Sequence, residues 1–310
     1  MSKNDEPTKR IERHCPVCGA ERTEPYLSKG PLHMVRCSQC SMLFANPVEA
    51  KYVEGAFYDR SAAPYYLSPD KLESDYAPVR FARELRLFRQ FCGRGSVLDV
   101  GCSTGAFLHQ LQKGFGNNYT VLGTDVSGPA LACAESRGVP VRRGPFLEQD
   151  FGAQHFAAIT FWAVLEHVAE PRRFLEKAAA LLEPGGHCFV LVPNMRSLAV
   201  RLAGSSYRYL MPEHLNYFTA DTLGRLVAPG RVFSLVTLQS THFNPVVLWQ
   251  DWRRKHESVP DAERARLLKQ TTAWKQNLAL APLRLAYGGL ERLLGALQLA
   301  DNLVAVLRRR

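Results

Sequence analysis

Four cysteines near the start of the chain form two pairs, each with two residues between the partners. The pairs are Cys15 with Cys18 and Cys37 with Cys40, and 18 residues separate them. Two such pairs can supply the four thiolates of a tetrahedral Zn²⁺ site. Four thiolates leave no position open for a substrate, so we expect the zinc ion to be structural. So small an element has little core of its own, and metal binding would supply much of its folding free energy.

A second chemical feature is an acid followed by a glycine-rich turn, in the segment VLDVGCSTG (97–105). Its apolar residues and Asp99 are typical of a buried strand. Gly101 and Gly105 lack a Cβ, so the backbone there can approach a ligand or adopt a positive φ. The helix that follows offers free N–H groups at its start. Asp125 ends the next strand and is placed to accept hydrogen bonds from ribose hydroxyls.

Strands and helices alternate around these residues. The expected strands are 97–100, 120–124, 139–141, 157–161 and 187–192, and the expected helices are 81–91, 105–113, 128–137 and 171–182. This alternation predicts an α/β fold whose parallel sheet has helices on both faces. Ligands of such sheets bind beyond the carboxyl ends of the strands, where Gly101, Asp125 and Trp162 would lie.

Further motifs occur in a fixed order along the same segment. VLEHV (164–168), PGG (184–186) and VPN (192–194) follow the glycine-rich turn. Together these motifs resemble those of the class I S-adenosylmethionine (SAM) dependent methyltransferases over about residues 80–245. The middle of the first motif, Cys-Ser-Thr-Gly, departs mildly from the family pattern. The resemblance implies a Rossmann-like seven-stranded sheet, with a sixth strand near 232–239 and an antiparallel last strand at 302–307.

The resemblance also implies where SAM binds. The implied SAM-binding residues are Asp99, Gly101, Cys102, Gly105, Asp125 and Trp162. Asp99 and Gly101 would line the methionine part, and Asp125 would bind the ribose. Phe146 and Leu147 are expected neighbours of the adenine.

Glu166, His167 and His214 are the candidate catalytic residues. Within the family that this sequence resembles, ubiquinone-pathway O-methyltransferases and small-RNA 2′-O-methyltransferases have an E-x-x-E-H motif at this position, which holds a divalent metal together with a later histidine. The first glutamate position is Ala163 here. One interpretation is a reduced metal site of two histidines and one carboxylate. Another is a general base, because imidazole titrates near neutral pH. A third is a structural, hydrogen-bonded histidine at residue 167.

The remaining segments complete a predicted domain organisation. It comprises a zinc ribbon (1–45), an aromatic-rich linker or lid (46–80), the SAM-binding core (81–245), a helical insertion (246–300) and the final strand (301–310). Tyr65 and Tyr66 of the lid either contact the ligands or pack against the core. The insertion carries an apolar stripe formed by Leu283, Leu285, Leu290, Leu293, Leu294 and Leu297. It suits a membrane surface or a partner, but packing on the protein itself is the favoured interpretation.

Composition limits the compartment and the partners. The chain has 310 residues and a formal net charge of +10, and residues 246–310 hold 12 Lys and Arg against 6 Asp and Glu. The sequence lacks an apolar stretch long enough for a membrane span, and its first residues are too charged for a secretory signal. We therefore expect a cytoplasmic protein. The basic excess suits an acidic partner such as RNA, a nucleotide sugar or an anionic membrane surface, or is a solvated face.

Three functions remain open from the sequence. The first is methyl transfer to a small molecule, namely a sugar, a glycolipid precursor or a secondary metabolite, because the segment EHLNYFT (213–219) and the cysteine pairs resemble bacterial enzymes of that kind. The second is RNA methylation. The cysteine element lacks the clustered basic and aromatic residues that bind single-stranded RNA, and this argues against it. The third is a SAM-binding scaffold without catalysis.

Overall fold

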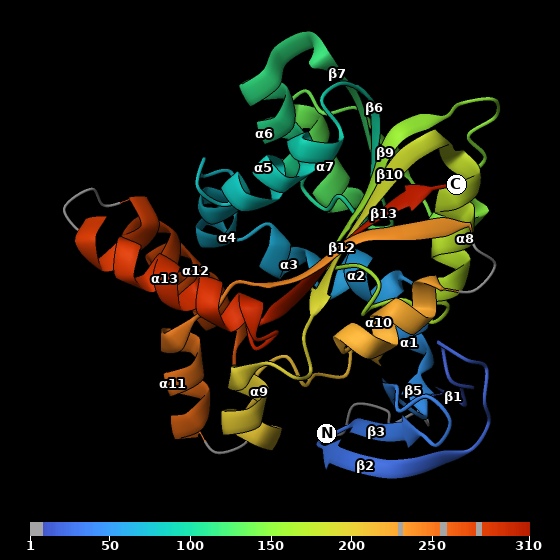
Figure 1. Ribbon diagram of the computed structural model, residues 1–310, viewed down its shortest axis with the longest axis vertical. Coiled ribbons are helices and arrows are strands. Elements are labelled where there is room, and N and C mark those ends of the chain that lie inside the picture. Colours follow the sequence, from blue (N-terminus) through green and yellow to red (C-terminus); the bar gives the residue numbers. More distant parts are fainter. Residues whose placement is uncertain (1–8, 229–231, 255–258, 277–280) are drawn as a thin grey trace, which may run out of the picture.

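The computed structural model describes residues 9–228, 232–254, 259–276 and 281–310. A seven-stranded sheet runs through its centre in the order β12-β13-β10-β9-β6-β7-β8 (Figure 1). Its strands are β6 (Gly95–Val100), β7 (Tyr119–Asp125), β8 (Val141–Arg143), β9 (Phe156–Trp162), β10 (Leu182–Pro193), β12 (Phe233–Thr241) and β13 (Asn302–Arg309). The pairs among β6 to β10 are parallel, whereas β13 is antiparallel to both of its neighbours. The predicted Rossmann-like fold with an antiparallel last strand is confirmed.

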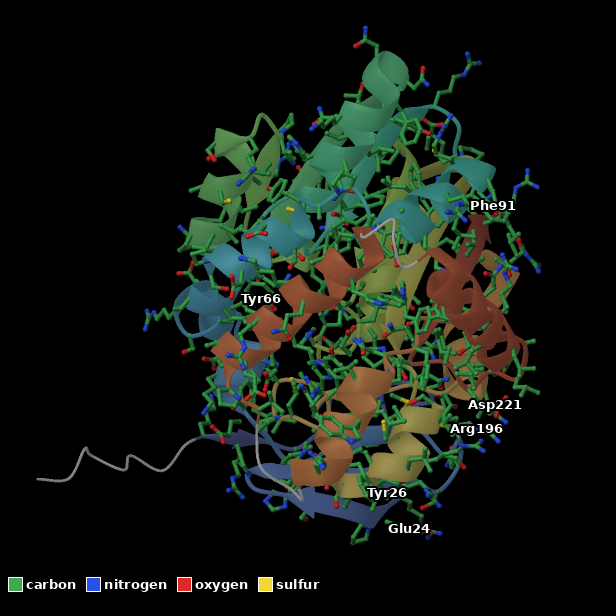
Figure 2. The ribbon with its side chains drawn as sticks, turned by 90° about the vertical axis from the view of Figure 1, so that its left-hand side faces the viewer. Glu24, Tyr26, Tyr66, Phe91, Arg196 and Asp221 are labelled. Atoms are coloured by element: carbon green, nitrogen blue, oxygen red, sulfur yellow. The ribbon has the colours of Figure 1, made fainter. Side chains whose placement is uncertain are left out.

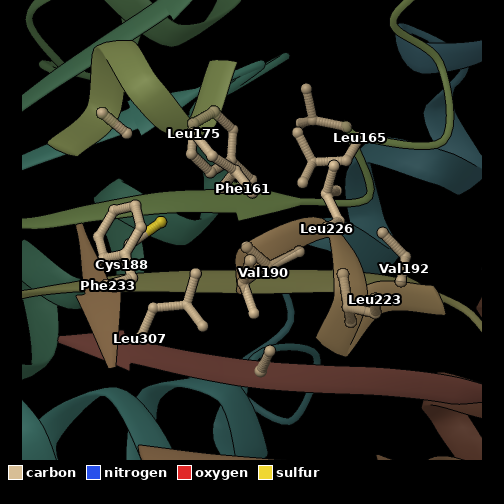
Figure 3. Packing of buried hydrophobic residues seen from close by; sticks show 14 of the residues in the cluster. Phe161, Leu165, Leu175, Cys188, Val190, Val192, Leu223, Leu226, Phe233 and Leu307 are labelled. Atoms are coloured by element: carbon tan, nitrogen blue, oxygen red, sulfur yellow. The ribbon is translucent and has the colours of Figure 1, made fainter. Parts of the chain in front are cut away.

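Helices cover both faces of this sheet. One layer contains α5 (Ala82–Phe91), α6 (Ala106–Phe115) and α7 (Gly128–Ser136), and the other contains α8 (Pro171–Leu181) and α10 (Ala220–Val227). Successive side chains of a strand point to opposite faces of the sheet, so β10 contributes side chains to the packing with both helix layers. Val190 packs with the α8 and α10 side, and Phe189 packs with the α5 and α6 side. Figure 3 shows the first of these clusters, in which Leu175 of α8 and Leu226 of α10 face the sheet.

The cysteine-bearing N-terminal segment forms a second sheet. Its strands are β2 (Thr23–Lys29), β3 (Leu32–Cys37), β4 (Leu43–Ala45) and β11 (Asn216–Tyr217), in the order β11-β4-β3-β2. A short pair, β1 (Arg10–Ile11) and β5 (Val48–Glu49), lies beside it. The strand β11 comes from the segment after β10, so the cysteine element and the core share one sheet.

Further helices from three parts of the chain lie toward the carboxyl ends of the parallel strands (Figure 1). They are α1 (Ala50–Val53), α2 (Ala56–Arg60), α3 (Ala63–Tyr66), α4 (Pro69–Asp75), α9 (Leu198–Ala203), α11 (Pro245–Arg254), α12 (Asp261–Gln276) and α13 (Ala281–Ala296). α12 packs against α3, which carries Tyr66, and against α4 (Figures 1 and 2). An ion pair joins α12 to α4, with Lys269 Nζ 3.1 Å from Asp70 Oδ1.

Two predictions about elements need correction. The third strand of the core begins at Val141, two residues later than predicted. Pro140 lacks a backbone N–H, and only its carbonyl oxygen joins β7, by accepting a hydrogen bond of 2.9 Å from Gly123 N.

The second correction concerns the leucine stripe of α13. Leu294 is buried, but Leu290, Leu293 and Leu297 are 42%, 56% and 58% exposed. The preferred interpretation, packing of the whole stripe on the protein itself, is therefore wrong for these three residues. The first two leucines of the stripe lie outside the residues whose side chains are described. Within the described part of the chain, we find no helix that is both long and apolar enough to span a membrane.

Candidate active site

A cavity of about 1200 Å³ lies at the carboxyl ends of β6, β7, β9 and β10. Residues of α2, α3 and α12 line its other side, together with the segment that carries His214. Pockets for one small molecule usually measure about 300–1,000 Å³. The cavity therefore has room for two small ligands side by side.

The glycine-rich turn after β6 forms one end of the cavity. Gly101 has a φ of +72°, and a Cβ there would lie 2.6 Å from Val164 Cγ2. Gly105 has a φ of +73° and caps α6, where a Cβ would lie 2.8 Å from Ala134 Cβ. Both positions require glycine, as predicted. Two features impose this requirement together: the positive φ and the close packing of neighbouring side chains within the protein.

Asp99 and Asp125 line the cavity beside this turn. Burial raises the pKa of Asp99 to about 7, and Thr160 Oγ1 opposes the shift by donating a hydrogen bond of 2.6 Å to its carboxylate. The Asp125 carboxylate accepts hydrogen bonds from the backbone N–H groups of Ser103, at 2.8 Å, and Ser127, at 2.9 Å. Burial nevertheless raises the pKa of Asp125. These bonds fix the Asp125 carboxylate on the cavity wall.

The other residues expected to bind SAM line the same cavity. A Cβ on Gly123 would lie 2.6 Å from Cys102 Sγ, so the thiol packs closely against this glycine of β7. The Trp162 ring packs on Phe107, with 5.2 Å between ring centroids, and its buried Nε1 has no hydrogen-bond partner in the described chain. Phe146 and Leu147 also line the cavity.

Glu166, His167 and His214 lie together in the wall of the cavity. Their ligand atoms all lie within 4.8 Å of one another. The two imidazole rings meet edge to face, with 4.6 Å between their centroids and 85° between their planes. Burial raises the pKa of Glu166 to about 8 and lowers the pKa of His167 to about 4. The pKa of His214 is also well below its usual value, because of burial and the nearby His167.

The contacts of His167 define its tautomer. Its Nδ1 lies 3.0 Å from the carbonyl oxygen of Glu213 and 2.9 Å from the Tyr58 hydroxyl. A carbonyl oxygen can only accept, so Nδ1 must carry the proton that it donates to Glu213. In a neutral imidazole the other nitrogen, Nε2, is then free to accept a proton. This arrangement suits a general base that stays uncharged at neutral pH.

The sequence pattern did not predict the place of two residues in the cavity. Tyr58 of α2 holds His167, although the sequence offered only its place in an aromatic-rich segment. Arg264 of α12 lies with its guanidinium 4.7 Å from the centroid of the Tyr65 ring, and its buried Nε has no partner within the described residues. Arg264 falls in a predicted helix whose pattern does not indicate which face meets the cavity.

The four N-terminal cysteines fit a metal site. The sulfur atoms of Cys15 and Cys40 are 3.4 Å apart, those of Cys18 and Cys37 are 3.5 Å apart, and all four lie within 4.8 Å of one another. A tetrahedral Zn–S₄ site with bonds of about 2.3 Å has sulfur atoms about 3.8 Å apart. The donor set and its spacing therefore match a closed structural zinc site.

We expect the substitution Gly101→Ala to weaken SAM binding by about tenfold or more, because a Cβ would clash with Val164 and the positive φ adds about 1 kcal/mol of strain. Equilibrium dialysis with labelled SAM measures the change. The matched control is Gly114→Ala within α6, where a Cβ meets nothing within 4 Å. Equal SAM affinity in both variants would contradict a role for the turn in SAM binding.

Comparison with known proteins agrees with this geometry. A family model described as "Methyltransferase domain" matches residues 75–229, half of the chain. The ubiquinone biosynthesis O-methyltransferase of Chromobacterium violaceum is 27% identical over 194 residues, which cover 56% of this chain and 81% of that protein. The enzyme of the same name from Cronobacter sakazakii is 32% identical over 120 residues, which cover 36% of this chain and 48% of that protein.

A solved structure supports the fold. A SAM-dependent methyltransferase of Thermotoga maritima, described as a possible histamine N-methyltransferase, superposes with a TM-score of 0.50. The match covers 80% of this chain and 99% of that one, at 16% sequence identity. With the family match over half of the chain and the site at the ends of the parallel strands, the chain belongs to the methyltransferase domain family and is a SAM-dependent methyltransferase.

Proposed function

We propose that the protein transfers the methyl group of SAM to a hydroxyl group of a small-molecule acceptor, of the sugar, glycolipid-precursor or secondary-metabolite class. The observation that carries this proposal is the buried pair of His167 and His214 in the same cavity as Asp99, Gly101 and Asp125. The names of the two ubiquinone-pathway relatives support an oxygen as the acceptor atom. The size of the cavity supports an acceptor bound beside SAM.

In this proposal the protein orients the two reactants and removes one proton. The sulfonium of SAM supplies an activated methyl group. The acceptor oxygen attacks the methyl carbon in line with the breaking C–S bond, whose electrons remain on sulfur. His167 Nε2 takes the hydroxyl proton, and the hydrogen bond from Nδ1 to Glu213 supports the charge that develops on the ring. Orientation of the two reactants in the cavity supplies much of the rate acceleration.

The pH dependence of kcat/KM tests which group is the base. Because the pKa of His167 is lowered to about 4, we expect kcat/KM for the acceptor, measured at saturating SAM, to stay constant from about pH 8 to about pH 6 and to fall only as the imidazole becomes protonated near pH 4. If ionised Glu166 were the base, its pKa of about 8 would make kcat/KM fall already as the pH drops below about 8. The measurement is the initial rate of transfer from methyl-labelled SAM.

A divalent cation on Glu166, His167 and His214 is the competing use of this site. The three donors lie close enough to hold an ion, but Ala163 at the position of the fourth ligand offers no donor atom. A bound cation would act as a Lewis acid on the acceptor hydroxyl. Activity that survives dialysis against EDTA supports the general base. Activity that is lost and then restored by Mg²⁺ supports the metal.

We further propose that Cys15, Cys18, Cys37 and Cys40 hold one structural Zn²⁺. The support is the sulfur spacing of the cluster and the closed ligand set. Cys15, Cys37 and Cys40 are buried, so the ion would be largely shielded from solvent.

A further inference from the structure

Two loops carry the histidine pair, and backbone hydrogen bonds join them. The loop after β9 carries Glu166 and His167, and the loop before β11 carries His214. The backbone N–H groups of Leu215 and Asn216 both donate to the carbonyl oxygen of Glu166, at 2.6 Å and 3.0 Å. The position of each ring therefore depends on how these two loops are held together.

The Asn216 side chain binds both ends of the first loop. Its Nδ2 donates to the carbonyl oxygens of Leu165 and Val168, each at 2.7 Å. These two carbonyls flank Glu166 and His167 in the sequence, so one amide group holds the turn that presents them. Asn216 is 1% exposed, and losing it would leave both carbonyl groups without this donor.

Arg13 adds the N-terminal element to the same assembly. Its Nη2 donates to Asn216 Oδ1 at 2.9 Å and to the Ala169 carbonyl at 2.8 Å. Its Nη1 donates to the carbonyls of Leu215, at 3.0 Å, and of Ala45 in β4, at 3.3 Å. A single guanidinium thus binds the loop of His167, the loop of His214 and the cysteine element. Its planar fork of donors suits such multiple contacts.

The location of Arg13 connects this network to the proposed zinc site. Arg13 is two residues before Cys15, and β4 starts three residues after Cys40. Folding of the cysteine element around a metal would therefore fix both the arginine and the carbonyl of Ala45. Neither Arg13 nor Asn216 belongs to the described lining of the cavity, so neither is placed to touch a ligand.

We propose that Arg13 and Asn216 are positioning residues that couple the metal-loaded cysteine element to the His167–His214 pair. This inference rests on the proposed function, because it assumes that the pair acts in catalysis. The cysteine element then controls the chemical step without contacting SAM or the acceptor. A displacement of about 1 Å of a reacting group can cost about 100-fold in rate.

The test compares Arg13→Ala and Asn216→Asp with the control Arg172→Ala. Asn216→Asp keeps the acceptor for Arg13 but removes the two donors to the loop of His167. Arg172 of α8 also binds the cysteine element, through the Val17 carbonyl, but among the described residues it forms no hydrogen bond with either histidine loop. We expect kcat to fall about 100-fold in the first two variants and about twofold or less in the control. The dissociation constant of SAM and the bound zinc per chain should remain unchanged in all three.

Equal losses of kcat in all three variants, or a parallel loss of SAM binding and zinc in Arg13→Ala, would overturn the inference, because the network would then act on general stability. A second readout separates this outcome from failure of the proposed function. In ¹⁵N-histidine-labelled protein, Arg13→Ala should shift the ring signals of His167 and His214, whereas Arg172→Ala should not. Unshifted ring signals overturn the coupling. Shifted signals in a protein without any methyl transfer keep the coupling and reject the proposed function instead.

Discussion

Replacing His167 with alanine is expected to lower kcat for methyl transfer by about 10²–10⁴-fold, the usual contribution of a positioned general base. The free Nε2 of this neutral ring is the proton acceptor of the proposed mechanism. SAM affinity should change by about twofold or less, because Gly101 and Asp125 stay intact. Single-turnover rates and equilibrium dialysis measure the two quantities separately.

The matched control for this experiment is His155→Ala. His155 is an exposed histidine in the loop before β9, away from the residues that line the cavity. We expect this variant to keep the wild-type kcat. A His167→Ala protein with the same kcat as His155→Ala would contradict the role of His167 and would leave its hydrogen bond to Glu213 as a structural feature only.

Replacing Cys37 with serine is expected to abolish binding of Zn²⁺ and to unfold the N-terminal element. Binding of structural zinc contributes about 10 kcal/mol or more in zinc-finger peptides, and it is folding free energy where no site exists in the unfolded chain. Because β11 completes the sheet of this element, unfolding would also release the loop that carries His214. Metal analysis, the thermal midpoint and protease cleavage within the first 45 residues measure these effects.

Cys133→Ser provides the control for the cysteine experiment. Cys133 is a half-buried residue of α7 and lies outside the four-cysteine cluster. It should keep one zinc ion per chain and the wild-type thermal midpoint. Wild-type protein that contains no zinc, or a Cys37→Ser variant that retains it, would contradict the proposed structural site.

The sequence could predict the central sheet and the turn after its first strand, because both depend on local patterns. Apolar runs that end in Asp99 and Asp125 mark strand ends, and the helices between them follow from spacing. The two glycines of the turn were also recognisable, but the sequence does not show why residue 105 must be glycine. Its contact with Ala134 depends on how α7 packs, which no local pattern encodes.

The parts that could not be predicted depend on contacts between distant residues. Tyr58 and His167 are 109 residues apart in the sequence, and Arg13 and Asn216 are 203 residues apart. Arg13 and Asn216 meet because β4 pairs with β11, and Tyr58 and His167 meet because α2 packs beside the ends of the parallel strands. Residue types and spacing show that an arginine and an asparagine are present, but they do not show that both donate to the same loop.

The most direct test of the account uses purified protein, methyl-labelled SAM and cell extract of the source organism, separated into RNA, small-molecule and lipid-linked pools. His167→Ala protein is assayed in parallel. The proposed function predicts label in the small-molecule or lipid-linked pool, and loss of that label with the variant. Label in RNA would contradict the proposed acceptor class and favour the basic C-terminal region as the substrate surface. Absence of label in every pool, despite measured SAM binding, would contradict catalysis and favour a SAM-binding scaffold.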